Sequence, residues 1–367
     1  MKTPYGEIYS GKNVQTGQEN ACLVMLARNS ELDHCLQSIR EQEDTFNKQY
    51  HYPWLFLNDE EYTEEFKSKI LDAVSGEARF GLIDPEHWTI PDWIDTKQVY
   101  ENLKTANSRN ILYGALLSYR HMCRYNSGFF YKHPMLLEYD WYWRVEPDVH
   151  FWCDVEYDVF TYMKNNNYTY GFTMTAHEYM ETIPTLFEST IEFFLNHTDY
   201  LDPNSAYKFL GDIDSNIEYN ACHFWSNFEI GDLHFYRNKM YQDYFEFLDQ
   251  KGGFFYERWG DAPVHTLAVA LMMPRSRIHH FADMGYYHSP YTRCPTDLES
   301  YKSGRCRCIV NDHNFDDDGY SCNKLWLDLY GRTTGSETST ADQLNERNEI
   351  AQLNRDLKAM NEEEKLP

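Results

Sequence analysis

A strand, a helix and a second strand follow one another near the start of the chain, and this order is the strongest constraint on the fold. The apolar run Cys22–Leu26 has the length of a buried strand. A helix is expected from about Glu31, because apolar residues then recur at helical spacing at Leu32, Cys35, Leu36 and Ile39. The stretch "YPWLFLNDE" predicts a second buried strand that ends in acidic turn residues. This order favours a right-handed βαβ unit and a nucleotide-binding type of sheet.

The same alternation of strands and helices continues along the chain. Strands are expected at residues 141–147 and 168–174, and helices at 110–128, 185–197, 240–251 and 261–273. Gly252 and Gly253 would close the third of these helices, and Pro263 would lie in the first turn of the fourth. With 367 residues the chain is long enough for one large core or two lobes that share one.

Three segments differ in composition. We predict a polar leader at residues 1–19, an α/β domain at 20–332 and a polar tail at 333–367, which lacks aromatic residues. The 33 Lys and Arg residues against 58 Asp and Glu give a formal charge of -25, which disfavours nucleic acid and anionic lipid surfaces. An anionic small substrate would therefore need a local metal ion or placed arginines. The 17% of aromatic residues fits either sugar-stacking surfaces or a large aromatic core.

Cysteine usage points to a secretory compartment. Four of the nine cysteines gather in a polar segment at Cys294, Cys306, Cys308 and Cys322. Zinc could bind them, but their spacing lacks paired C-x2-C knuckles, so at least one disulfide is expected within this cluster. Two N-x-[ST] sequons, at Asn167 and Asn196, fit the same location. No apolar run is long enough to span a membrane, so the protein is either cytosolic or lacks its N-terminal signal or anchor in this sequence.

One strand ends on two carboxylates held by a proline. In "YWRVEPDVHFWCDVEYDVF" the aromatic and β-branched residues give way to Glu146, Pro147 and Asp148. Carboxylates that leave an open α/β sheet at its crevice can hold Mn2+ or Mg2+ against a diphosphate. Read alone, the same tripeptide fits a turn with solvated acids.

Three further stretches place polar residues among aromatic ones. Each residue could be a hydrogen-bonded core group when it is taken alone. The candidates are Asn227, Glu229 and Asp232 in "FWSNFEIGDLHFYR", Glu257, Arg258, Trp259, Asp261 and His265 in "GGFFYERWGDAPVHTLA", and His288 in "ADMGYYHSPYTRCP".

Taken together, these stretches resemble the fungal α-1,2-mannosyltransferases of the secretory pathway, glycosyltransferase family 15. The matching stretches also include "LARNSEL" and "SYRHMCRYNSGFFYKHP", and the likeness extends from about Asn20 to Tyr330. The resemblance implies a GT-A type fold and retaining transfer of mannose from GDP-mannose to mannosylated glycan acceptors, O-linked or N-linked. It also implies a Golgi lumen enzyme, held at the membrane only through an N-terminal anchor that is absent from this sequence.

The resemblance also implies roles for single residues. Glu229 is similar to the candidate nucleophile of the family, and His288 to its Mn2+ ligand, with Glu146 and Asp148 serving the metal and the nucleotide ribose. Tyr119 and Arg144 would stabilise the leaving phosphate. Arg28 would meet the nucleotide, Asp261 would join the catalytic set, and the expected substrate contacts are Asn227, Trp259, Arg258 and Glu257.

Three other functions compete with this one. The family resemblance also admits a mannosylphosphate transferase. A carbohydrate-binding protein without turnover would be expected to have a broken metal set, whereas Glu146, Asp148, Glu229 and His288 are all present. A retaining glycoside hydrolase needs two carboxylates but neither His288 nor a diphosphate pocket.

Overall fold

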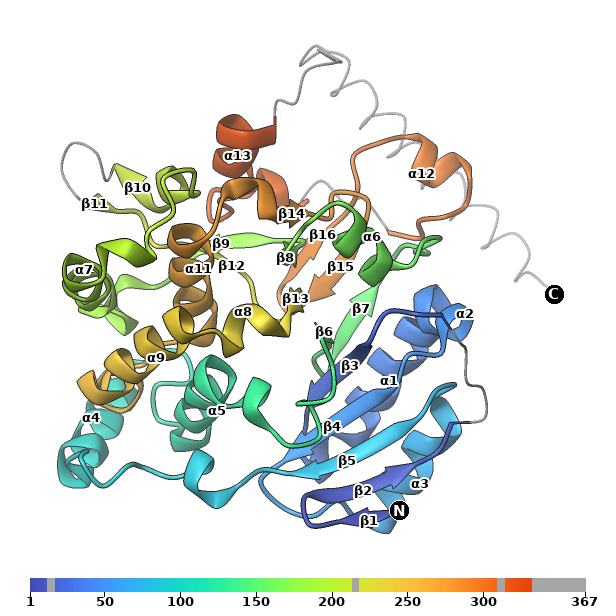
Figure 1. The fold of residues 1–367 in the computed structure, drawn as a ribbon, viewed down its shortest axis with the longest axis horizontal. Coiled ribbons are helices and arrows are strands. Elements are labelled where there is room, and N and C mark those ends of the chain that lie inside the picture. Colours follow the sequence, from blue (N-terminus) through green and yellow to red (C-terminus); the bar gives the residue numbers. More distant parts are fainter. Residues whose placement is uncertain (12–16, 213–217, 309–313, 332–367) are drawn as a thin grey trace.

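The computed structural model describes residues 1–11, 17–212, 218–308 and 314–331. A nine-stranded mixed sheet runs through the molecule in the order β1-β2-β5-β4-β3-β6-β13-β8-β14 (Figure 1). Its strands are β1 (Lys2–Thr3), β2 (Gly6–Tyr9), β3 (Ala21–Leu26), β4 (Trp54–Asn58), β5 (Ala78–Leu82), β6 (Trp141–Arg144), β8 (Tyr170–Phe172), β13 (Glu229–Asp232) and β14 (Ile278–His280). β3 is parallel to β4 and β6, as expected for a βαβ unit, whereas β13 is antiparallel to β6 and β8.

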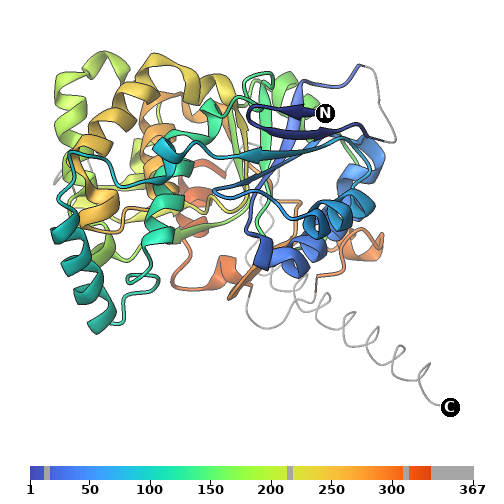
Figure 2. The ribbon, with the colours of Figure 1, turned by 90° about the horizontal axis from the view of Figure 1, so that it is seen from below.

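Helices cover both faces of this sheet (Figure 2). On one face, α1 (Leu32–Gln42) and α3 (Glu64–Ala73) pack against Leu23 and Met25 of β3. On the other, α5 (Leu117–Gly128), α9 (Lys239–Lys251) and α11 (Asp261–Met272) pack against Cys22 and Val24. Because successive strand residues point to opposite faces, one apolar run supplies both cores.

The other helices are short or peripheral. They are α2 (Lys48–Tyr50), α4 (Thr96–Ser108), α6 (Val159–Asn165), α7 (Leu186–Asn196), α8 (Leu233–Arg237), α10 (Gly253–Tyr256), α12 (Glu299–Lys302) and α13 (Asn323–Trp326). The helices expected near 185–197, 240–251 and 261–273 are confirmed as α7, α9 and α11. Gly252 ends α9 with a φ of 76°, the left-handed conformation that glycine adopts without strain.

Two local predictions are wrong. The helix expected at residues 110–128 begins only at Leu117, because Asn110 and Tyr113 have φ values of 53° and 55°, which a right-handed helix does not permit. The leader predicted at residues 1–19 is also partly built into the fold, because β2 pairs antiparallel with β5. The tail predicted at 333–367 lies outside the described residues.

Smaller sheets complete the fold. A three-stranded antiparallel sheet joins β16 (Tyr291–Arg293), β15 (Tyr286–His288) and β7 (Val149–Phe151). There are also two antiparallel strand pairs. One joins β9 (Thr175–His177) to β12 (Cys222–Phe224), and the other joins β10 (Gly211–Asp212) to β11 (Glu218–Tyr219). Since β7 follows β6 after a short turn, the first of these sheets brings the segment after residue 285 to the end of β6.

Three disulfides tie the C-terminal segment to the rest of the molecule. Cys294–Cys308 lies within the four-cysteine cluster and confirms the disulfide expected there. The other two cluster members pair with earlier cysteines, in the bonds Cys153–Cys306 and Cys222–Cys322. Those partners lie 153 and 100 residues earlier in the chain, so spacing within the cluster gave no signal for them.

Both sequon asparagines, Asn167 and Asn196, are exposed at the surface. Among the residues that the structure describes, no helix combines the length and the apolar character needed to cross a membrane.

Candidate active site

The strand expected at residues 141–147 is shorter in the structure and ends before the acidic pair. β6 stops at Arg144, and Asp148 takes a φ of 62° before β7 begins. The two carboxylates then diverge. Glu146 turns back to accept a hydrogen bond from Nε of Arg144 at 2.6 Å, whereas Asp148 is exposed, with Oδ1 3.2 Å from Nδ1 of His34. The two carboxylates therefore do not face one common ligand, because Glu146 contacts Arg144 and Asp148 contacts His34.

Arg144 is the electrostatic centre of the site. Its Nη1 donates to Oδ2 of Asp261 at 2.6 Å, and Ser226 donates to the same oxygen at 2.7 Å. Burial opposes the charge of Arg144, but Glu146 and Asp261 raise the pKa of the guanidinium well above its usual value. Burial alone would raise the pKa of Asp261. The charge of Arg144, with smaller contributions from His265 and Ser226, outweighs burial and lowers the pKa of Asp261. For Glu146 burial dominates and the pKa is raised.

Glu229 lies opposite this arginine. It is the first residue of β13 and pairs with Arg144 of β6 in antiparallel register, so both side chains stand on the same face of the sheet. Its side chain is 1% exposed; Oε2 accepts a hydrogen bond from the Tyr170 hydroxyl at 3.0 Å and lies 3.0 Å from Nδ1 of His265. A carboxylate this deeply buried depends on such partners.

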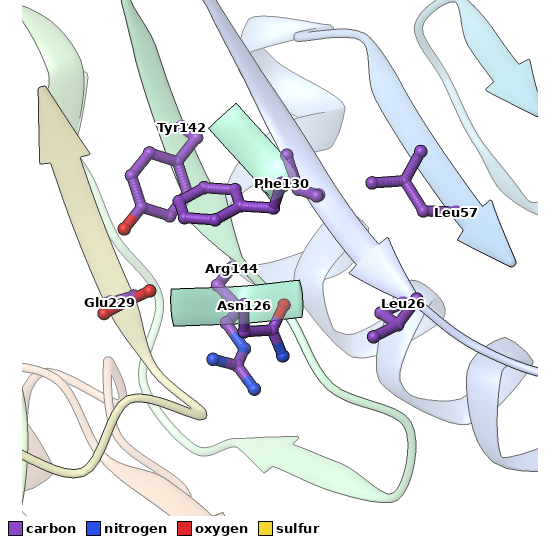
Figure 3. A pocket seen from close by; sticks show the side chains of 8 residues that line it. Leu26, Leu57, Asn126, Phe130, Tyr142, Arg144 and Glu229 are labelled. Carbon is purple, nitrogen blue, oxygen red and sulfur yellow. The ribbon is translucent and has the colours of Figure 1, made fainter. Parts of the chain in front are cut away.

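A pocket opens beside Glu229 at the ends of the central strands (Figure 3). Glu229, Arg144 and Asn126 group at one end, and Leu26 and Leu57 lie at the other. Leu26 and Leu57 belong to the carboxyl ends of the parallel strands β3 and β4, the position where open α/β sheets bind ligands. Arg28 follows β3 directly and is exposed at this same edge.

The structure brings His288 next to Asp148. His288, the last residue of β15, pairs with Val149 of β7, the residue that follows Asp148. Its Nδ1 lies 3.2 Å from the carbonyl oxygen of Ser289, which leaves Nε2 for another partner. Burial lowers the pKa of His288, so the ring is held in the neutral form that binds metals. His288 and the exposed Asp148 thus fit a hard divalent ion such as Mn2+.

The three predicted metal ligands are not gathered around one point. A candidate metal site is a group of three or more His, Cys, Asp or Glu residues whose ligand atoms all lie within 4.8 Å of one another. Within the described part of the chain, the residues that meet this criterion are His177, Cys222 and Cys322. Because those two cysteines form a disulfide, they are not free thiolates for a metal. Glu146 accepts a hydrogen bond from Arg144 in this structure, and its assignment as a metal ligand beside His288 and Asp148 stays a prediction.

Of the remaining predicted contacts, Arg258 lies against Tyr119. The guanidinium of Arg258 lies 5.3 Å from the centre of the Tyr119 ring, and its Nη2 is 3.3 Å from Glu178. Burial raises the pKa of Tyr119 well above its usual value, so its hydroxyl remains protonated and can donate. Asn227 is buried, and within the described residues its Oδ1 has no hydrogen-bond partner.

Trp259 and Glu257 hydrogen-bond to each other. The Trp259 side chain is buried in the core at 1% exposure, and its indole N–H donates to Glu257. The other carboxylate oxygen of Glu257 accepts from Thr185. Glu257 is only partly buried, and the sugar contacts expected of both residues stay predictions.

Three residues of the site were not predicted. Tyr170 and Ser226 donate to Glu229 and Asp261, and Asn126 lines the pocket beside them. Each lies in a stretch rich in aromatic residues, so a core role was the natural interpretation. His265 was a candidate without an assigned role, although its position four residues after Asp261 places both on one face of α11.

A mixed α/β sheet with charged side chains at the ends of its central strands is the architecture expected of a GT-A glycosyltransferase. The chain belongs to the glycolipid 2-alpha-mannosyltransferase family, whose model matches residues 2–331. It is 50% identical over 318 residues to a glycolipid 2-alpha-mannosyltransferase of Saccharomyces cerevisiae, covering 86% of this chain and 71% of the relative. It is 49% identical over 303 residues to an O-glycoside alpha-1,2-mannosyltransferase of Schizosaccharomyces pombe, covering 83% and 77%.

Solved structures agree with the fold. A Mn/GDP form of core-mannan synthase A from Aspergillus fumigatus superposes with a TM-score of 0.81 at 37% identity, covering 89% of this chain and 91% of that one. The mannosyltransferase Ktr4p of S. cerevisiae in complex with GDP gives 0.80 at 38% identity, covering 92% and 88%. The resemblance found in the sequence motifs is thus confirmed over the described domain, and the protein is a glycosyltransferase.

His288 provides a first test of the site. We expect His288→Ala to weaken Mn2+-dependent GDP binding by at least about tenfold, on the order of 1.4 kcal/mol, because His288 is a predicted metal ligand. Isothermal titration of GDP at a series of Mn2+ concentrations measures this effect. His34→Ala is the matched control, since His34 contacts Asp148 from the other side of the turn. An unchanged Mn2+ titration in folded His288→Ala would remove His288 from the metal site.

Proposed function

We propose that the protein is a retaining α-1,2-mannosyltransferase that moves mannose from GDP-mannose to mannosylated glycans, O-linked or N-linked. The observation that carries this proposal is the Glu229 carboxylate at the pocket, opposite a permanently charged Arg144. A carboxylate on one side of a sugar and a cation for the departing phosphate are the two charges that such a transfer needs. The relatives named for α-1,2-mannosyl transfer and the GDP-bound structural neighbours support the donor and the linkage.

Each charged group has a distinct role in this proposal. Arg144 faces the developing negative charge of the leaving diphosphate, and Asp261 with Ser226 holds its guanidinium in place. The protonated Tyr119 hydroxyl is a donor for the same leaving group. A Mn2+ ion, where bound, would be held by His288 and Asp148 and would neutralise the diphosphate in a protein of net charge -25.

Glu229 supports retention of configuration. Retention requires either a double displacement through a glycosyl-enzyme or departure and attack on one face through a short-lived ion pair. The first route requires a carboxylate under the face of the anomeric carbon opposite the leaving group, and in the second a carboxylate there stabilises the ion pair. Glu229 fills that role in either case, as nucleophile or as the charge that stabilises an oxocarbenium-like centre.

The compartment and the domain limits belong to the proposal as well. We place the reaction in the Golgi lumen, in the domain at residues 20–332 together with the edge strand β2. Three disulfides and two exposed sequons support an oxidising secretory compartment.

A binding measurement followed by turnover tests this function. We expect GDP to raise the Tm more with Mn2+ than without it, because the diphosphate then binds through the metal. The same preparation should transfer mannose from GDP-mannose to methyl α-mannoside, and nuclear magnetic resonance of the product should show an α-1,2 linkage. Stabilisation by GDP without transfer to any mannoside would favour a binding protein, and transfer of mannosyl phosphate would favour the phosphotransferase alternative.

A further inference from the structure

A histidine that makes no contact with the pocket holds Glu229 in place. His265 lies on α11, is fully buried, and uses both ring nitrogens in hydrogen bonds. Nδ1 lies 3.0 Å from Oε2 of Glu229, and Nε2 lies 3.0 Å from the backbone carbonyl oxygen of Asn126. Three aromatic rings surround the imidazole, with ring centres 4.9 to 6.2 Å away: Tyr236, Tyr241 and Phe130.

The protons of this pair follow from its partners. A carbonyl oxygen can only accept, so Nε2 of His265 carries a proton. The contact between Nδ1 and Oε2 then needs one more proton, on the imidazole or on the carboxyl group, because two lone pairs would otherwise face each other. One shared proton therefore neutralises the buried charge of Glu229, and Tyr170 donates a second hydrogen bond to the same oxygen.

The two carboxylate oxygens of Glu229 are consequently different. Oε2 accepts from Tyr170 and shares a proton with Nδ1 of His265, whereas no hydrogen bond from a described residue reaches Oε1. Glu229 lines the pocket, and Oε1 is the oxygen left to face a ligand there. Because one oxygen is hydrogen-bonded and the other is not, the carboxylate has a fixed orientation. A nucleophile or an electrostatic stabiliser requires such an orientation.

We infer that His265 is the positioning residue of Glu229, which fixes Oε2 and takes up the shared proton as positive charge develops at the anomeric carbon. In that step the Oε2–H bond breaks and the Nδ1–H bond forms, so Glu229 carries its full negative charge when the sugar is cationic. The inference rests on the role proposed for Glu229. It predicts that His265 affects the chemical step and leaves donor binding unchanged.

Five single variants, Glu229→Gln among them, and one double variant test the inference. We expect His265→Leu to lower kcat roughly 10²-fold while the Kd of GDP changes less than about threefold. His265→Asn places an amide N–H near the position of Nδ1, and His265→Gln near that of Nε2. The Asn variant should therefore be at least about tenfold faster than the Gln variant. The buried His133, which bonds only backbone groups, gives the control: His133→Asn should leave kcat unchanged.

The double variant separates this inference from the proposed function. If His265 acts through Glu229, Glu229→Gln/His265→Leu should be no more than about threefold slower than Glu229→Gln alone. The positioning role would be overturned if the kcat losses of the two single variants multiplied in the double variant, or if His265→Asn and His265→Gln had equal kcat values. If the Leu variant does not fold, the comparison of the Asn and Gln variants still decides. A fully active Glu229→Gln would instead overturn the proposed role of Glu229. An inactive Glu229→Gln beside an active His265→Leu would reject only this inference.

Discussion

Glu229→Gln is expected to lower kcat by roughly 10² or more while the affinity for GDP-mannose stays within about threefold. Glutamine is nearly isosteric and can still accept from Tyr170 through its carbonyl oxygen. It has no negative charge to place against a cationic sugar, so the loss should fall on the transition state. Single-turnover kinetics with GDP-mannose, together with calorimetric binding of the donor, separate the two effects.

Asp232, at the far end of the same strand, provides the matched acidic control on β13. It caps α8 by accepting from the backbone N–H of His234 and lies away from the pocket. Asp232→Asn should therefore keep kcat near the unmodified value. Donor binding that falls in step with kcat in Glu229→Gln would make Glu229 a donor-positioning residue, and a near-normal kcat would remove it from the mechanism.

Arg144→Met should produce the largest combined loss of stability and activity. The substitution removes the partner of two mostly buried carboxylates, Glu146 and Asp261, whose side chains are 15% and 7% exposed. Leaving such charges without a partner costs about 3–5 kcal/mol of unfolding free energy. The loss of the cation opposite the leaving diphosphate should also lower kcat by about 10²–10³. Urea unfolding and kcat per folded molecule measure the two effects.

Arg124→Met is the matched control for this prediction. Arg124 is likewise buried and forms a two-pronged ion pair with Asp249 at 2.7 and 2.8 Å, but neither residue lines the pocket. It should lose a comparable amount of stability while the folded fraction keeps its kcat. If both variants lost kcat to the same extent, the effect of Arg144 would be one of folding alone, and its role at the phosphate would be wrong.

Local patterns in the sequence were sufficient to predict the centre of the fold. The strands β3 and β4 are continuous apolar runs, and α7, α9 and α11 have clear helical spacing, so few alternatives compete with them. The short strand β2 contributes only four residues to an edge, and nothing in that pattern distinguishes it from a polar leader. The segment before Leu117 has helical composition, but the positive φ values of Asn110 and Tyr113 depend on tertiary contacts.

The candidate site was predictable in residue type but not in geometry. Pro147 correctly marked the end of β6, yet the choice of Arg144 as partner of Glu146 and Asp261 joins residues up to 117 positions apart. Likewise, α11 is buried on all sides, so His265 could not be told from an ordinary core residue without the position of Glu229. Side-chain pairing across the sheet is a tertiary property, and no local pattern specifies it.

The disulfides impose an order on biosynthesis. Cys306 and Cys322 leave the ribosome long after their partners Cys153 and Cys222, and Cys294, which follows β16, pairs with the still later Cys308. The hairpin that carries His288 is thus secured only when translation of the domain is almost finished. The β3–β4 half of the sheet contains none of these six cysteines, whereas the β15–β16 hairpin is secured covalently only by cysteines that are made late. We therefore expect the complete fold, and the transfer activity proposed for it, to depend on this late oxidation.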